Sequence, residues 1–173
     1  MLFRSQIKDY EAAYERITTL TKILSFPKLD FKRAEINEMS ALLSLRLGKG
    51  KFKEYEQKAN ELYKDDKYRM ALSTYNYACV MSEMGMKEIA SKYLEKALEN
   101  YPTENTSKVT SFMLLNVYEF IKDDALDKAQ KCNNHALDLA ISLDDIRLVE
   151  KAYYFKAIIL EKQGNLVSRS EER

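Results

Sequence analysis

Apolar residues recur at helical spacing along most of the chain. Between residues 86 and 102 they stand three and four positions apart, which places them on one stripe of a helix that Pro102 ends. Residues 67 to 84 show the same spacing and are followed by Gly85, which permits the turn after a helix. The pattern predicts two antiparallel helices. Their stripes contain Met70, Ala71, Tyr77, Ala78, Met81 and Met84, then Ile89, Ala90, Tyr93, Leu94, Ala97 and Leu98.

The same pattern returns further along the chain. Five identities share an offset of 79 positions, and two alanine pairs share an offset of 39, so the repeating unit has about 40 residues. Repetition in one register indicates duplicated helix pairs. The identities are Asp65/Asp144, Asp66/Asp145, Tyr75/Tyr154, Ala78/Ala157 and Gly85/Gly164, with Ala90/Ala129 and Ala97/Ala136 between them.

The remaining segments are assigned around these pairs. Residues 3 to 25 are expected to form one long helix before "FPK", and 145 to 163 a first helix closed by Gly164. The polar "NLVSRSEER" is too short to complete a last pair. The chain is then a segment of a longer protein, or its end helices act as caps. One domain, 1–173, is divided into 1–27 (half-repeat or capping helix), 30–64, 66–102, 106–142 and 145–173 (incomplete).

The segment 66–102 resembles a tetratricopeptide (TPR) repeat. It has the small Ala78, then Ala90 twelve positions later, Leu94 and the closing Pro102, although Thr74 replaces the usual aromatic residue. The resemblance implies an all-α, right-handed superhelical solenoid of antiparallel helix pairs. HEAT-like pairs are the alternative architecture. The unit 106–142 departs further, with Val117 at the close contact and Asn133 where a large apolar residue belongs.

Paired aspartates precede two of the predicted helices. Asp66 and Asp145 are interpreted as helix N-caps rather than metal ligands, and Asp124 is expected to cap the second helix of 106–142. Ala78 and Ala157 are expected at close helix crossings, where substitution by Leu would destabilise the fold by about 1–3 kcal/mol.

Composition narrows the classes of function. A net charge of +1 with both signs interspersed disfavours nucleic acid binding, and no apolar run indicates a membrane span or signal peptide. Cys79 and Cys132 lack a CxxC partner, which favours reduced thiols in a cytoplasmic protein. His135 is the only histidine, and motifs of phosphate loops and hydrolases are missing. We therefore expect no catalytic residues, no metal site and no cofactor.

The resemblance to TPR proteins implies that first helices line a concave binding face. The chaperone-tail clamp of that family needs Lys, Asn and Arg at these positions, whereas this chain has mainly Tyr, Leu, Cys and Ile, so an apolar or amphipathic peptide is expected instead. The tyrosines could equally pack between neighbouring helices. The expected lining is Tyr75, Cys79, Glu83, Leu114, Tyr118, Lys122, Tyr154, Ile158 and Glu161.

The repeat length of about 40 residues and the richness in Tyr, Asn and Lys also resemble the sensor domains of Rap-like and other peptide-responsive bacterial regulators. Those regulators often hold a peptide backbone with asparagine side chains. Asn37, Asn76 and Asn116 are spaced by 39 and 40 residues, but their places relative to the small residues do not form one ladder at 100° per residue. Asn76 is kept as a candidate.

The sequence thus predicts a non-catalytic peptide- or protein-binding module, the sensor or interaction part of a cytoplasmic regulator that responds to a peptide. The alternative is an assembly scaffold, for example a homodimer, that stacks through the incomplete terminal helices.

Overall fold

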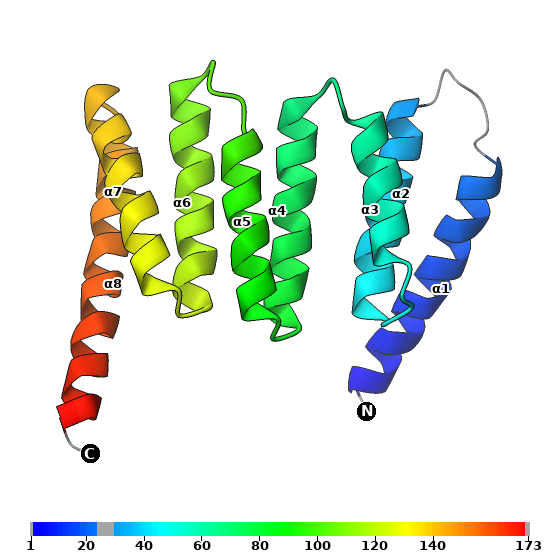
Figure 1. Ribbon diagram of the computed structural model, residues 1–173, viewed down its shortest axis with the longest axis horizontal. Helices are drawn as coiled ribbons and strands as arrows, with labels where there is room; N and C mark the ends of the chain where they lie inside the picture. The colour runs from blue at the N-terminus through cyan, green and yellow to red at the C-terminus, as the bar shows by residue number, and fades with distance from the viewer. Residues whose placement is uncertain (1, 24–29, 172–173) are drawn as a thin grey trace.

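The protein, described by a computed structural model, consists of α-helices joined by short turns (Figure 1). The structure describes residues 2–23 and 30–171, except the side chains of 2–8, 21–23, 31 and 165–171. Within these residues there are eight helices and no strand, so the predicted all-α class is confirmed. The helices are α1 (Leu2–Ile23), α2 (Asp30–Arg46), α3 (Phe52–Leu62), α4 (Lys67–Glu83), α5 (Lys87–Asn100), α6 (Thr106–Lys122), α7 (Leu126–Ser142) and α8 (Ile146–Glu171).

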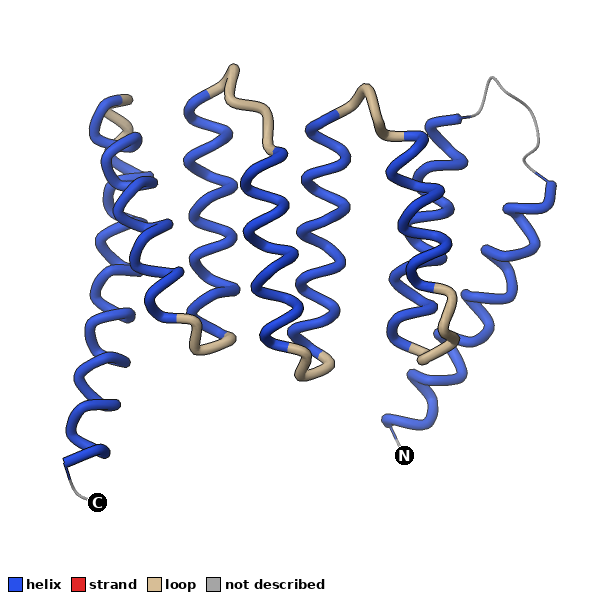
Figure 2. Tube along the Cα trace, in the orientation of Figure 1, coloured by secondary structure: helices blue, strands red, loops and turns tan. Residues whose placement is uncertain are grey.

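The helices follow one another across the molecule in chain order, and their directions alternate (Figures 1 and 2). Sequential neighbours pack together except at the step from α3 to α4, and most extensively α4 with α5, α2 with α3 and α6 with α7. The even-numbered helices also contact in succession: α2 with α4, α4 with α6, and α6 with α8. Among the described residues, none of the helices has the length and apolar character that a membrane span requires.

The pair α4 and α5 forms where the apolar stripes predict it. Ala78, Ala90 and Ala97 are fully buried, which lets the two backbones approach closely. Asp66 caps α4 as predicted, because its carboxylate accepts the backbone N–H of Arg69 at 3.0 Å. Before Pro102, Tyr101 adopts the extended conformation that a following proline imposes, and α5 ends there.

Four helices end with the same backbone turn. In α4, Met86 N–H bonds to Met81 C=O and Gly85 N–H to Ser82 C=O, both at 2.9 Å, with Gly85 at φ +79°. This is the Schellman arrangement, which needs one residue of positive φ after the helix. Equivalent bonds end α2, α6 and α7, with Gly48, Asp124 and Asp144 at positive φ.

The predicted capping role of Asp124 is therefore wrong. Asp124 ends α6, while the N-cap of α7 is Ala125, which provides no side-chain cap. The Asp124 carboxylate instead pairs with Lys87 at 3.3 Å and Lys162 at 2.9 Å. Asp145 does cap α8, since it accepts the backbone N–H groups of Arg147 and Leu148.

The largest apolar core extends over α4 to α8. Val117, the predicted close contact of α6, is fully buried in it. Asn133, which replaces an expected apolar residue, is also buried and donates its amide to the Ala152 carbonyl at 3.0 Å. This hydrogen bond joins α7 to α8.

The last helix differs from the prediction in two ways. Gly164 does not end it, because α8 continues to Glu171; one glycine inside a helix costs only about 1 kcal/mol relative to Ala. Ala157 is exposed rather than buried at a helix crossing, since among the described residues α8 packs mainly against α7 and α6. At the other end, "FPK" at 26 to 28 lies outside the described residues.

Candidate functional site

Five of the predicted lining residues lie together, on α4 and α6. Tyr75, Cys79 and Glu83 follow one side of α4, and their polar groups act electrostatically on Tyr118 or Lys122 of α6. Contact between α4 and α6 explains this proximity. These five residues therefore lie near one another across the two helices.

Tyr75 packs between the two helices. Its ring lies 5.6 Å from that of Phe112, and its hydroxyl interacts with the thiol of Cys79. Burial, followed by the interaction with Cys79, raises the pKa of Tyr75. These contacts favour a packing role for Tyr75, the alternative left open by the sequence.

The two cysteines are free thiols, each half-buried. Burial raises the pKa of Cys79 to about 11 and that of Cys132 to about 12. Both thiols are therefore protonated at neutral pH, the form with little nucleophilic reactivity.

Glu83 and Lys122 belong to a row of charges that recurs once per helix pair. Arg46 at the end of α2 pairs with Glu83 of α4, and Lys122 of α6 pairs with Glu119 at 3.1 Å. Burial lowers the pKa of Lys122, but its hydrogen bond to Glu119 and the nearby negative charge of Glu83 more than offset this, and the pKa is raised. The Arg46–Glu83 pair joins two neighbouring first helices, whereas Lys122 and Glu119 both lie on α6.

The other predicted lining residues have mixed positions. Leu114 is fully buried in the core, so its predicted place on the lining is wrong. Tyr118 is 55% exposed and Tyr154 64% exposed, available to a ligand. Ile158 packs partly against the core, and Glu161 is exposed without an ion pair among the described residues.

Among the three regularly spaced asparagines, only Asn76 reaches another helix. It donates its amide to Glu38 of α2 at 2.9 Å, and Tyr63 donates its hydroxyl to the other oxygen of that carboxylate at 3.1 Å. Asn37 and Asn116 are buried and bond to carbonyls of their own helices. The three side chains therefore do not act as one ladder.

Two grooves, not predicted from the sequence, lie on either side of Leu72 in α4. The groove between α2 and α4 has a volume of about 380 Å³, and the groove beside α6 about 290 Å³. Since Leu72 lines both, the two are adjacent across α4. The first is lined by Glu35, Glu38, Met39, Arg69, Leu72, Ser73 and Asn76, and the second by Tyr68, Leu72, Tyr101, Ser107, Lys108, Ser111, Phe112 and Leu115.

These grooves combine exposed apolar side chains with charge of opposite sign. Met39 in the first groove, and Tyr68 and Leu115 in the second, are exposed large apolar residues. Glu35 and Glu38 lie at the α2 end, and Lys108 lies at the α6 end. A signal for part of the site was present in the sequence, because Leu72 and Leu115 lie within about one turn of the predicted lining residues Tyr75 and Leu114. No lining residue was predicted on α2, which carries Met39.

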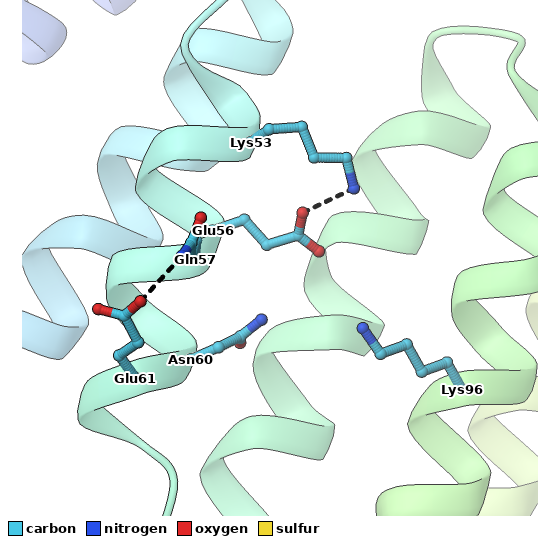
Figure 3. Close-up of a pocket in the computed structure, with 6 residues that line it drawn as sticks. All are labelled: Lys53, Glu56, Gln57, Asn60, Glu61 and Lys96. Carbon is cyan, nitrogen blue, oxygen red and sulfur yellow. Dashed lines mark hydrogen bonds and ion pairs between the residues drawn. The ribbon is translucent and has the colours of Figure 1, made fainter.

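A third hollow, of about 460 Å³, lies between α3 and α5 and is polar (Figure 3). Lys53 pairs with Glu56 at 2.8 Å, and Gln57 donates to Glu61 at 2.9 Å. Figure 3 shows Asn60 and Lys96 extending toward each other across this hollow. Four of the six lining residues pair with one another, whereas the buried amide oxygen of Asn60 has no hydrogen-bond partner among the described residues. Because the hollow lacks the exposed large apolar side chains of the two grooves, we do not place the candidate site there.

Over the described part of the chain, no three His, Cys, Asp or Glu side chains are grouped so that they could hold a metal ion. The exposed His135 lies on α7. Comparison with protein-family models, with curated proteins and with solved structures returns no match for the chain.

Proposed function

We propose that the chain is a peptide-binding repeat module whose ligand lies along the grooves on either side of Leu72. The repeats would form a TPR-like, right-handed solenoid in which α2, α4, α6 and α8 make up the inner layer. The succession of contacts among these helices supports that arrangement. The module is non-catalytic and is the sensor or interaction part of a cytoplasmic regulator that responds to a peptide.

The observation that carries the proposal is the continuity of the two grooves. Both are open to solvent and meet at a single leucine, while exposed Met39 and Leu115 stand on the helices at either side. A ligand that crosses α2, α4 and α6 would cover all three apolar side chains. An extended or helical peptide can be long enough to cross these three helices, and its apolar residues would occupy the two grooves.

The charges of the grooves indicate the kind of peptide. Glu35 at one end favours a basic residue, although it already interacts with Lys32 and Arg69. At the other end, Lys108 has no ion pair among the described residues and favours an acidic residue. We therefore propose an amphipathic peptide with an apolar centre and charges of opposite sign at its ends.

Apolar contact alone would give weak binding. Covering about 300 Å² of apolar surface contributes about 7 kcal/mol at about 25 cal/mol per Å². Association costs about 4–15 kcal/mol, so polar contacts at Lys108, Asn76 or the peptide backbone must supply the difference.

The test is a selection of displayed random peptides on the immobilised protein. Peptides with an apolar centre and a polarised charge should be enriched on the wild-type chain and lost on Met39→Ala/Leu115→Ala. The matched control is Ile89→Ala, which removes an exposed apolar side chain of α5 outside both grooves. Failure to enrich any peptide, or equal enrichment on all three proteins, would contradict the proposal.

A further inference from the structure

One side of α8 is left uncovered by the rest of the described chain. Ala152, Phe155 and Ile159 face the core, whereas the opposite side presents Ile146 (69% exposed), Tyr153 (52%) and Leu160 (52%). A hollow of about 470 Å³ adjoins Ile146 and Tyr153 at the start of the helix. Such a row of large apolar side chains on one helix is typical of an interaction surface.

Comparison with α4 shows that this side occupies the position of a helix–helix contact. The residues 79 positions earlier are Ala71, Thr74, Ala78 and Met81, and all four are buried where α4 packs against α5. Their counterparts in α8 are exposed. They are Glu150, Tyr153, Ala157 and Leu160.

We infer that a second copy of this chain covers α8, with the two α8 helices packed antiparallel about a two-fold axis. Residues 146, 150, 153, 157, 160 and 164 have the alternating spacing of three and four that lets two helices pack along a seam. In the antiparallel register, Tyr153 meets Ala157 of the second copy, and Ile146 meets Gly164. Tyr153 and Ile146 are then each opposite a small residue, whereas Leu160 meets Glu150 of the second copy. Two-fold symmetry makes every pair occur twice.

Charge supports the same register. Arg147 and Glu161 flank the seam on one side, and the antiparallel arrangement places each opposite the other in the second copy. Arg147 is almost fully exposed, with only Asp145 at 3.9 Å as an ion-pair partner, and Glu161 has none within the described residues. The surface is therefore complementary to itself in charge, and in size at Tyr153 and Ile146, which argues for a second copy over an unrelated partner.

This surface is separate from the grooves at Leu72, so the inference does not rest on the proposed peptide binding. It gives the assembly alternative of the sequence analysis a specific form: a closed dimer rather than an open stack.

Sedimentation velocity of the 173-residue chain over a concentration series tests the dimer. The wild type should pass from monomer to dimer, and Arg147→Glu or Glu161→Arg alone should weaken the dimer at least about tenfold through like charges. Mixing these two variants should restore dimerisation, because each then supplies the charge that the other lacks. Ala157→Arg should abolish dimerisation. Lys92→Glu, a charge reversal at an exposed position of α5, should leave dimerisation unchanged.

Circular dichroism would establish that each variant is folded, as expected for substitutions at exposed positions. A monomer at every concentration, or a dimer unaffected by the three α8 variants, would overturn the inference. Growth beyond the dimer would also overturn it, since a two-fold pair leaves no second copy of this surface free.

Discussion

Residues of one type perform different tasks at the helix ends of this protein. Asp66 and Asp145 accept backbone N–H groups at helix starts, whereas Asp124 and Asp144 adopt positive φ where a preceding helix ends. Aspartate is among the few non-glycine residues that tolerate this conformation. A carboxylate next to a predicted helix therefore does not reveal which end it serves.

Gly85 and Gly164, which are 79 positions apart in the repeat, provide a direct test of local backbone conformation. Gly85→Ala should destabilise the protein by about 1–2 kcal/mol, because Ala is strained at positive φ. Gly164→Ala should stabilise it by about 0.5–1 kcal/mol, because Gly164 lies inside α8. A Cβ at either position would meet no atom within 4 Å, so conformation alone decides the sign.

Urea denaturation measures both changes. A stabilising Gly85→Ala would contradict the positive φ of Gly85, and a destabilising Gly164→Ala would contradict the continuation of α8 through Gly164.

The buried thiols give a prediction about reactivity. Because the pKa of Cys79 lies near 11 rather than at its ordinary value of 9.0, the native thiolate fraction near neutral pH is about one hundredth of that of a free thiol. Alkylation by iodoacetamide should be correspondingly slow in the folded protein and fast in urea. Rapid labelling of the native protein at neutral pH would contradict the burial of both thiols.

The same shift has a consequence for stability. The folded state retains the proton of Cys79 at a higher pH than the unfolded state does, so its stabilising contribution is complete below about pH 9. The contribution should fall as the pH rises from about 9 to about 11.

At the scale of helices, equivalent positions differ because their surroundings differ. Ala78 and Ala157 occupy one repeat position, yet Ala78 is fully buried and Ala157 is exposed. The repeat register predicts which residues share a helical position. It does not predict which helices have a neighbour on that side.

This pair can be tested by one substitution. Ala78→Leu should destabilise the chain by about 1–3 kcal/mol through overpacking at the contact of α4 and α5. Ala157→Leu should change the stability of the monomeric chain by less than about 0.5 kcal/mol, as for most exposed positions. Thermal unfolding at low protein concentration compares them, and equal destabilisation would show that Ala157 is covered within a single chain.

The groove was only partly predictable for a related reason. Successive residues of a helix are separated by about 100°, so a shift of one residue moves a side chain from the core to the surface. Leu114 lies 39 positions after Tyr75 and was expected beside it, but Leu114 is buried and the next residue, Leu115, is exposed in the groove. The rotation of each helix about its own axis depends on packing with its neighbours, which periodicity does not specify.

At the scale of the whole molecule, the all-α class and the positions of most helices follow from the apolar stripes and the turn residues between them. Stripe and turn are local features, so one sequence suffices to predict them. The surfaces that we propose for binding depend on contacts between different helices, as with Met39 and Leu72 of the first groove, which are 33 positions apart, or between two copies, as with Arg147 and Glu161. They emerge only when the helices are assembled.

The proposed binding of a peptide along the grooves at Leu72 can be measured directly. Its most direct test is a calorimetric titration of one selected peptide into the wild type, Met39→Ala, Leu115→Ala and the Ile89→Ala control. We predict that each groove variant weakens binding about tenfold, whereas the control binds as the wild type does. Unchanged affinity in both groove variants would contradict the account and place the peptide elsewhere on the protein.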